Sequence, residues 1–191
     1  MIIRNSLRAT LSLLALATSL LSLRCHQDDT RVFPTGDPAN FVVLVDQSFS
    51  DEQRDIIREA GNEWVDSLGG CLSLSYIVTP TTSLRETTSE NGIINMFLRK
   101  PAEGKAGWTS WSVNGTGAFI YIDPAYDADV FFRIVQHELG HAFHLVHYTG
   151  PAESIMRPNV EINSSNLTLV DVTAFCEEWR CCDLFETKSP Q

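Results

Sequence analysis

The chain has 191 residues, of which 43% are hydrophobic and 20% are charged, a balance typical of one globular domain with its own core. Its 14 Lys and Arg residues against 24 Asp and Glu residues give a formal net charge of −10. Such an acidic chain is a poor partner for nucleic acid and for an anionic membrane surface. We therefore predict no nucleic-acid partner. We separately expect a monomer.

The first 24 residues predict a secretory signal peptide. Arg4 and Arg8 supply the positive charge at its start, and the apolar run LSLLALATSLLSL follows from Leu11 to Leu23. These 13 residues are too few for a membrane span, which takes about 20. The sequence thus predicts a secreted or extracytoplasmic protein.

Removal of residues 1–24 would leave a short N-terminal segment, residues 25–39, ahead of a domain that covers residues 40–191. The position of the cut is open, because small residues that suit a signal peptidase occur at both Ala17 and Ser19.

Five cysteines fit an exported protein. Four lie in the predicted domain and predict disulfides whose pairing the sequence leaves open: Cys71, Cys176, Cys181 and Cys182. The fifth, Cys25, would tether the protein to a membrane if it carried a lipid. Arg24 stands before it, where a lipid-attachment motif has a small residue. A membrane partner is therefore expected only through a lipid on Cys25.

The hydrophobic pattern predicts a first strand over Asn40–Asp46 and then a helix. Ser50 can cap this helix, and Gln53 stands three residues on, as in a capping box. Apolar residues recur at helical spacing over the following turns: Ile56, Ile57, Ala60, Trp64 and Leu68. Gly69-Gly70 predicts the end of the helix.

Short apolar runs then predict three further strands: Leu72–Val78, Ile93–Leu98 and Gly117–Ile122. A second helix is predicted from about Asp129 through a cluster of histidines. After a polar loop, a last amphipathic helix is predicted over Leu167–Trp179, with Ser165 or Asn166 as its cap. This order predicts an α/β (α+β) fold, in which two long helices pack on one twisted mixed sheet and a C-terminal helix follows.

The histidine cluster predicts a zinc site. His137 and His141 stand four residues apart on a helix, so both rings project from one face, about 6 Å apart along the axis, and can share one zinc ion. Glu138 can take a proton from a water that the ion activates. His147 supplies a third ligand if the chain bends after the helix. Three protein ligands leave the open position that a catalytic zinc requires.

Together with Ser154–Pro158 (SIMRP), which begins soon after His147, the histidine run resembles the metzincin clan of metallopeptidases and, within it, the matrixins. The clan pattern is H-E-x-x-H-x-x-G-x-x-H followed by a Met-turn. The resemblance implies a metzincin-like fold and a secreted endopeptidase that hydrolyses peptide bonds in proteins by a zinc-activated water.

Residue by residue, the resemblance implies one catalytic zinc held by His137, His141 and His147. It implies that Glu138 is the general base and that Met156 forms an apolar floor under the metal without binding it.

The resemblance also implies how substrate is held. Pro158, Asn159 and Val160 would line the pocket for the substrate residue after the scissile bond. An edge strand within Ala106–Val113 would pair with an extended protein or peptide substrate.

His144 departs from the clan pattern, which has glycine at this position. That glycine ends the helix with a positive φ, which histidine tolerates better than most residues. We predict that the ring of His144 points away from the metal, toward solvent or a backbone carbonyl. Alternatively His144 is the third ligand, but on an unbroken helix it would lie about 10.5 Å beyond His137. His147 is therefore the preferred ligand.

Two alternatives remain from the sequence. Asp123, Asp127 and Asp129 offer oxygens that suit calcium, although turn and cap roles are the preferred interpretation. The rival to an enzyme is a catalytically silent, zinc-stapled binding protein of the same fold. Glu138 argues against this rival because a structural zinc site has no use for that carboxylate, whereas the unusual His144 argues for it.

Overall fold

The computed structural model describes residues 39–84, 92–101, 104–112, 117–159 and 166–180. The predicted signal peptide, the segment of residues 25–38 and Val160 lie outside these residues. So do three of the five cysteines, at positions 25, 181 and 182, and the expected disulfides therefore stay a prediction.

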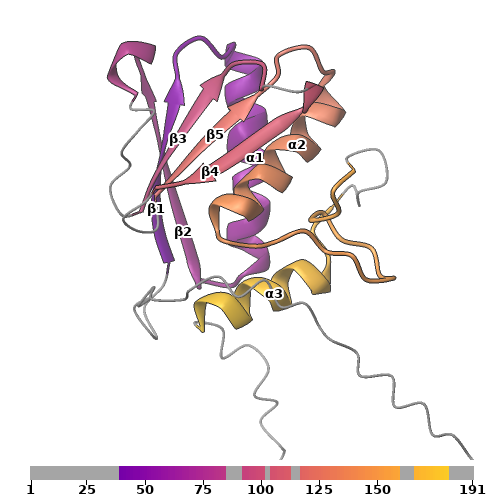
Figure 1. The fold of residues 1–191 in the computed structure, drawn as a ribbon. Helices are drawn as coiled ribbons and strands as arrows, with labels where there is room; N and C mark the ends of the chain where they lie inside the picture. Colours follow the sequence, from indigo (N-terminus) through magenta and orange to yellow (C-terminus); the bar gives the residue numbers. More distant parts are fainter. Residues whose placement is uncertain (1–38, 85–91, 102–103, 113–116, 160–165, 181–191) are drawn as a thin grey trace, which may run out of the picture. The chain divides into compact units, whose positions relative to one another are not determined.

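The described strands form one five-stranded sheet in the order β2-β1-β3-β5-β4 (Figure 1). Their bounds are β1 Ala39–Asp46, β2 Leu72–Thr79, β3 Ile93–Leu98, β4 Gly107–Trp111 and β5 Ala118–Ile122. β1, β2, β3 and β5 run parallel, whereas β4 runs antiparallel to β5 at one edge of the sheet. The mixed sheet and the edge strand within Ala106–Val113 are thus confirmed.

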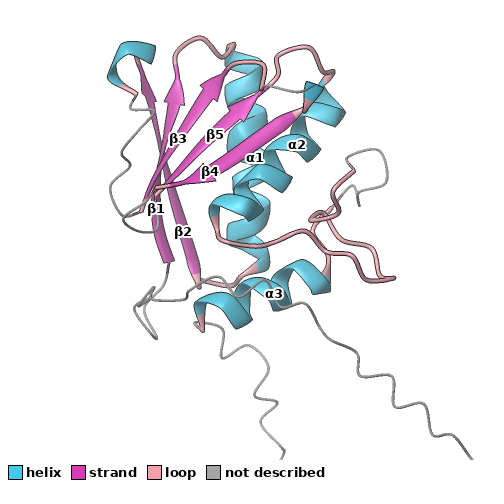
Figure 2. Cartoon of the chain, viewed as in Figure 1, coloured by secondary structure: helices cyan, strands magenta, loops and turns pink. Residues whose placement is uncertain are grey.

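Two long helices, α1 (Asp51–Ser67) and α2 (Ala128–Ala142), pack against each other and against the sheet (Figure 2). The predicted capping box of α1 forms, since the Ser50 hydroxyl accepts from the Gln53 N–H and the Gln53 side chain accepts from the Ser50 N–H. The wholly buried Trp64 ties the helices together, because its indole Nε1 donates to the Gln136 carbonyl on α2 at 3.1 Å.

The C-terminal helix α3 spans Leu169–Trp179, so the predicted start at Leu167 and the predicted cap at Ser165 or Asn166 are wrong. Thr168 is the cap residue. Its side chain and N–H pair with the backbone and side chain of residue 171, and this reciprocal pairing fixes where the helix begins.

A short 3₁₀ helix, η1 (Thr81–Ser83), follows β2. Within the described ranges, every helix is too short or too polar to cross a bilayer.

Candidate metal centre and active-site cleft

The chain leaves the helix where the sequence predicts a bend. α2 ends at Ala142, and His144 has a φ of +70°. The His144 N–H donates to the His141 carbonyl, and the Leu145 N–H reaches back to the Gly140 carbonyl at 3.0 Å. This turn carries the next residues back across the end of α2, which brings position 147 to the face that bears positions 137 and 141.

Three ring nitrogens converge at this face. The Nε2 atom of His147 lies 3.2 Å from that of His141 and 3.3 Å from that of His137. Two nitrogens on one tetrahedral zinc ion, each bonded at about 2.0–2.1 Å, stand roughly 3.3–3.4 Å apart. Among the described residues, no other group of three or more His, Cys, Asp or Glu side chains is arranged to share a metal ion. The spacing of the three histidines therefore fits zinc.

The Nδ1 atoms of His137 and His141, the two histidines on α2, each contact a backbone carbonyl. Nδ1 of His137 lies 2.8 Å from the Ile155 carbonyl, and Nδ1 of His141 lies 2.8 Å from the Leu145 carbonyl. A carbonyl only accepts, so each Nδ1 donates and each Nε2 carries the lone pair. The two helical rings thus turn their lone pairs toward the point where the three Nε2 atoms converge, an arrangement suited to a cation at that point.

Burial keeps these imidazoles neutral. It lowers the pKa of His137 and His147 and, aided by the other two rings, lowers the pKa of His141 to about 4. Neutral imidazole is the form that binds a metal, so the site does not have to lose protons near pH 7 before binding.

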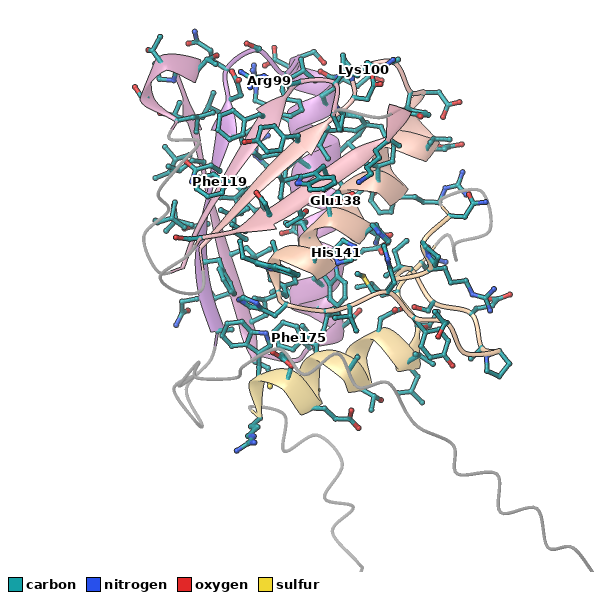
Figure 3. All side chains as sticks on the ribbon, viewed as in Figure 1. Arg99, Lys100, Phe119, Glu138, His141 and Phe175 are labelled. Carbon is teal, nitrogen blue, oxygen red and sulfur yellow. The ribbon has the colours of Figure 1, made fainter. Side chains whose placement is uncertain are left out.

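Glu138 lies beside this group on α2 and is only 5% exposed. Burial raises the pKa of its carboxyl to about 7, against the hydrogen bond from Thr109 and the charge of Lys105, which lower it. A carboxyl whose pKa lies near neutrality suits an acid–base role. Figure 3 labels Glu138 and His141 on the part of α2 that lies near β4.

His144 does not belong to the metal-binding group. Its ring stacks on Trp111, with 5.6 Å between centroids and 11° between planes, and its centroid lies 6.1 Å from that of Trp179. The side chain is 6% exposed, so the ring points away from the three converging histidines as predicted, whereas the predicted orientation toward solvent is wrong. Trp111 of β4 and Trp179 of α3 thus form the packing site for the His144 imidazole. The local sequence around His144 does not reveal this site.

Met156 packs against α2 at a point where the helix has a glycine. Met156 is 2% exposed, and a Cβ built on Gly140 would lie 2.3 Å from its sulfur. The lack of a side chain at Gly140 therefore lets the methionine approach the helix between His137 and His141.

The turn that carries Met156 is held by Asp171 of α3, a residue that the sequence analysis missed. Its buried carboxylate accepts from the Ser154 hydroxyl at 2.6 Å, from the Ile155 N–H at 3.2 Å and from the N–H and hydroxyl of Thr168. Ile155 in turn accepts from His137. The capping-box pattern Thr168-x-x-Asp171 was the signal available in the sequence.

A cleft of about 510 Å³ passes over the site. Its lining includes residues 104–109, Pro158 and Asn159 together with His137, Glu138, His141 and His147. The structure thus brings the predicted pocket residues Pro158 and Asn159 to the same cleft as the predicted ligands.

The aspartates weighed for calcium have other partners. Asp127 caps α2 by accepting from the Val130 N–H, and Asp123 accepts from the Ala125 N–H and lies 3.6 Å from the Lys100 ammonium. The preferred turn and cap roles of Asp123 and Asp127 are therefore confirmed. Asp129 lies in the first turn of α2.

No family model and no curated protein matches the sequence. Among solved structures, the chain is similar to high choriolytic enzyme 1, a hatching enzyme zinc-protease from Oryzias latipes (medaka fish), with a TM-score of 0.56 and 12% identity over 81% of this chain and 97% of that one. It is also similar to myroilysin, with a TM-score of 0.50 and 13% identity over 81% of this chain and 88% of that one. At such identities the likeness concerns the fold, which is therefore metzincin-like and shared with zinc metalloproteases.

Proposed function

We propose that the chain is a secreted zinc-dependent endopeptidase that hydrolyses peptide bonds in proteins. The observation that carries this proposal is the convergence of three Nε2 atoms, 3.2 and 3.3 Å apart, next to a buried carboxyl at the base of a cleft. A purely structural zinc site is closed by four protein ligands, whereas three protein ligands and an adjacent carboxyl match a hydrolytic site.

In this proposal His137, His141 and His147 hold one zinc ion. When bound, zinc supplies Lewis acidity, which polarises the scissile carbonyl and makes a water nucleophilic near neutral pH. Glu138 takes a proton from the attacking water, whose oxygen bonds to the carbonyl carbon. As the C–N bond breaks, Glu138 passes that proton to the leaving nitrogen, and the second proton of the water follows from the new carboxyl group, so the products are a carboxylate and an ammonium group.

The cleft suits an extended polypeptide. β4 is the last strand of the sheet, so its outer edge offers backbone groups that can pair with a substrate strand. Pro158 and Asn159 line the same cleft and, with Val160, would border the pocket for the substrate residue after the scissile bond. Met156 would form the apolar floor beneath the metal.

Two finer parts of the proposal rest on sequence features. The Ser154–Pro158 motif favours the matrixins within the clan. The apolar run Leu11–Leu23 and the cysteine content favour secretion. The partner is then a protein or peptide substrate met outside the cytoplasm, and the enzyme acts as a monomer.

The decisive experiment measures zinc stoichiometry and the cleavage of an unfolded protein, with and without a chelator. We expect one zinc per chain, cleavage that the chelator abolishes, and recovery when zinc is restored. The matched variant is Glu138→Ala, which should keep the zinc and lose on the order of 10²–10⁴-fold in hydrolysis. One bound zinc without cleavage of any unfolded protein would instead favour the zinc-stapled binding protein.

A further inference from the structure

One face of β4 makes specific contacts with the part of α2 that bears Glu138 and His141. Because side chains alternate along a strand, positions 107, 109 and 111 share a face. A Cβ at Gly107 would meet Glu138, the Thr109 hydroxyl reaches the Glu138 carboxylate, and the Trp111 indole donates to the His141 carbonyl at 2.7 Å. Trp108, on the other face, is 42% exposed.

Gly107 provides the space that the Glu138 side chain occupies. A Cβ at this position would lie 2.5 Å from Oε1 and 2.7 Å from Cγ of Glu138, closer than real Cβ atoms approach. The carboxylate therefore lies directly against the backbone of β4, with Oε1 next to position 107. This is the strand to which the proposed function assigns the substrate.

Thr109 holds the other carboxylate oxygen. Its hydroxyl lies 2.5 Å from Oε2 of Glu138 and 3.1 Å from the backbone carbonyl of the same residue. A hydroxyl has a single hydrogen to donate, and the shorter contact, to a charged acceptor, is the stronger one. Oε2 is thus tied to the strand, while Oε1 remains for the reaction.

We propose that Thr109 is a positioning residue, whose hydroxyl fixes the rotamer of Glu138 so that Oε1 carries the reacting proton along the backbone of β4. This inference rests on the proposed function. A free glutamate side chain samples several rotamers, and small misplacements of a reacting group are costly to rate. The hydroxyl therefore couples the strand that binds substrate to the group that moves the proton.

Kinetics provide the first test. Thr109→Val keeps the shape but loses the donor, Thr109→Ser keeps the donor, and Ser73→Ala removes an exposed hydroxyl from β2, at the opposite edge of the sheet. We expect Thr109→Val to lower kcat roughly 10- to 100-fold, with KM and zinc stoichiometry unchanged. Thr109→Ser should restore most of kcat, and Ser73→Ala should equal the parent. Equal kcat for Thr109→Val and the parent would overturn the inference, as would a loss in Thr109→Val that Thr109→Ser does not repair.

A double-mutant cycle provides a test that does not need turnover. Chemical unfolding of the full chain, as purified, is compared for Thr109→Val, Glu138→Leu and the double variant. If the two side chains share a direct hydrogen bond, the effects of the two single changes on the unfolding equilibrium constant do not multiply to give the effect of the double change. We expect a deviation on the order of tenfold. Single effects that multiply to give the double effect would overturn the inference. If the parent cleaves no protein, the proposed function fails on its own, while the cycle still reports whether Thr109 holds Glu138.

Discussion

The imidazole of His144 lies nearly parallel to the indole of Trp111, and the same indole donates a hydrogen bond to the carbonyl of His141, a predicted zinc ligand. The residue that replaces the usual glycine at the bend is therefore part of the packing that supports the metal site. Glycine would adopt this positive φ without strain but would lose the observed stacking on Trp111.

His144→Gly should lower stability by about 1–2 kcal/mol, because the loss of a buried ring and its aromatic contact outweighs the relief of a φ of +70°. Zinc stoichiometry should stay at one per chain. Chemical denaturation and metal analysis check both outcomes. His144→Asn is the control, since asparagine also tolerates positive φ but lacks the ring. A gain in stability for His144→Gly would show that strain dominates.

His147→Ala should weaken zinc binding by more than about 100-fold, since even residues that only orient a ligand cost 10- to 100-fold when removed. His144→Ala should leave the affinity close to that of the parent, because this ring faces Trp111. Competition with a chromophoric chelator measures both affinities. The opposite ranking of the two variants would make His144 the third ligand.

Asp171→Ala should lower the free energy of unfolding by about 2–4 kcal/mol, because the Ser154 hydroxyl and the Ile155 N–H would lose a buried acceptor. Zinc affinity should fall as well, since Ile155 orients His137. Urea denaturation and metal titration test the two effects. Asp171→Asn retains an acceptor oxygen and should lose less than Asp171→Ala, and equal losses would count against the hydrogen-bond explanation.

Gly140→Ala should destabilise the chain by about 1–3 kcal/mol through overpacking, because the added methyl would lie 2.3 Å from the Met156 sulfur. Met156→Ala opens space at the same point. The double variant should therefore recover part of the loss caused by the first change. Thermal unfolding of the four proteins gives this coupling, and strictly additive losses would mean that the two residues do not share the space.

His141 should contribute a loss of stability to the metal-free chain as the pH falls from about 6.5 toward 4, whereas Glu138, whose pKa burial raises to about 7, contributes the opposite slope. Burial and the neighbouring rings lower the pKa of His141 to about 4 in the folded protein, whereas an unfolded histidine titrates near 6.5. At this histidine the unfolded chain binds more protons in this window, so the contribution of His141 to stability rises with pH across it. Urea midpoints at several pH values measure the slope, and His141→Leu should remove this rising contribution. An unchanged slope in that variant would assign the effect to other groups.

The sequence predicts best what depends on neighbours along the chain. The Ser50 capping box, the bounds of β3 and the bend at His144 follow from local patterns, and the structure agrees with each. The contacts between Thr109 and Glu138 and between Asp171 and Ile155 join residues 29 and 16 positions apart. Such pairs depend on how β4, α2 and α3 pack, which no periodicity in the sequence encodes.

The three converging nitrogens come from positions 137 to 147, so a bound ion would close a loop of about ten residues. Closing so short a loop removes little chain entropy from the unfolded state. The helices and the sheet pack around a core that includes the wholly buried Trp64, Ile120 and Phe175. We therefore expect the apoprotein to stay folded and to reload zinc without refolding, unlike small zinc domains that have no core of their own.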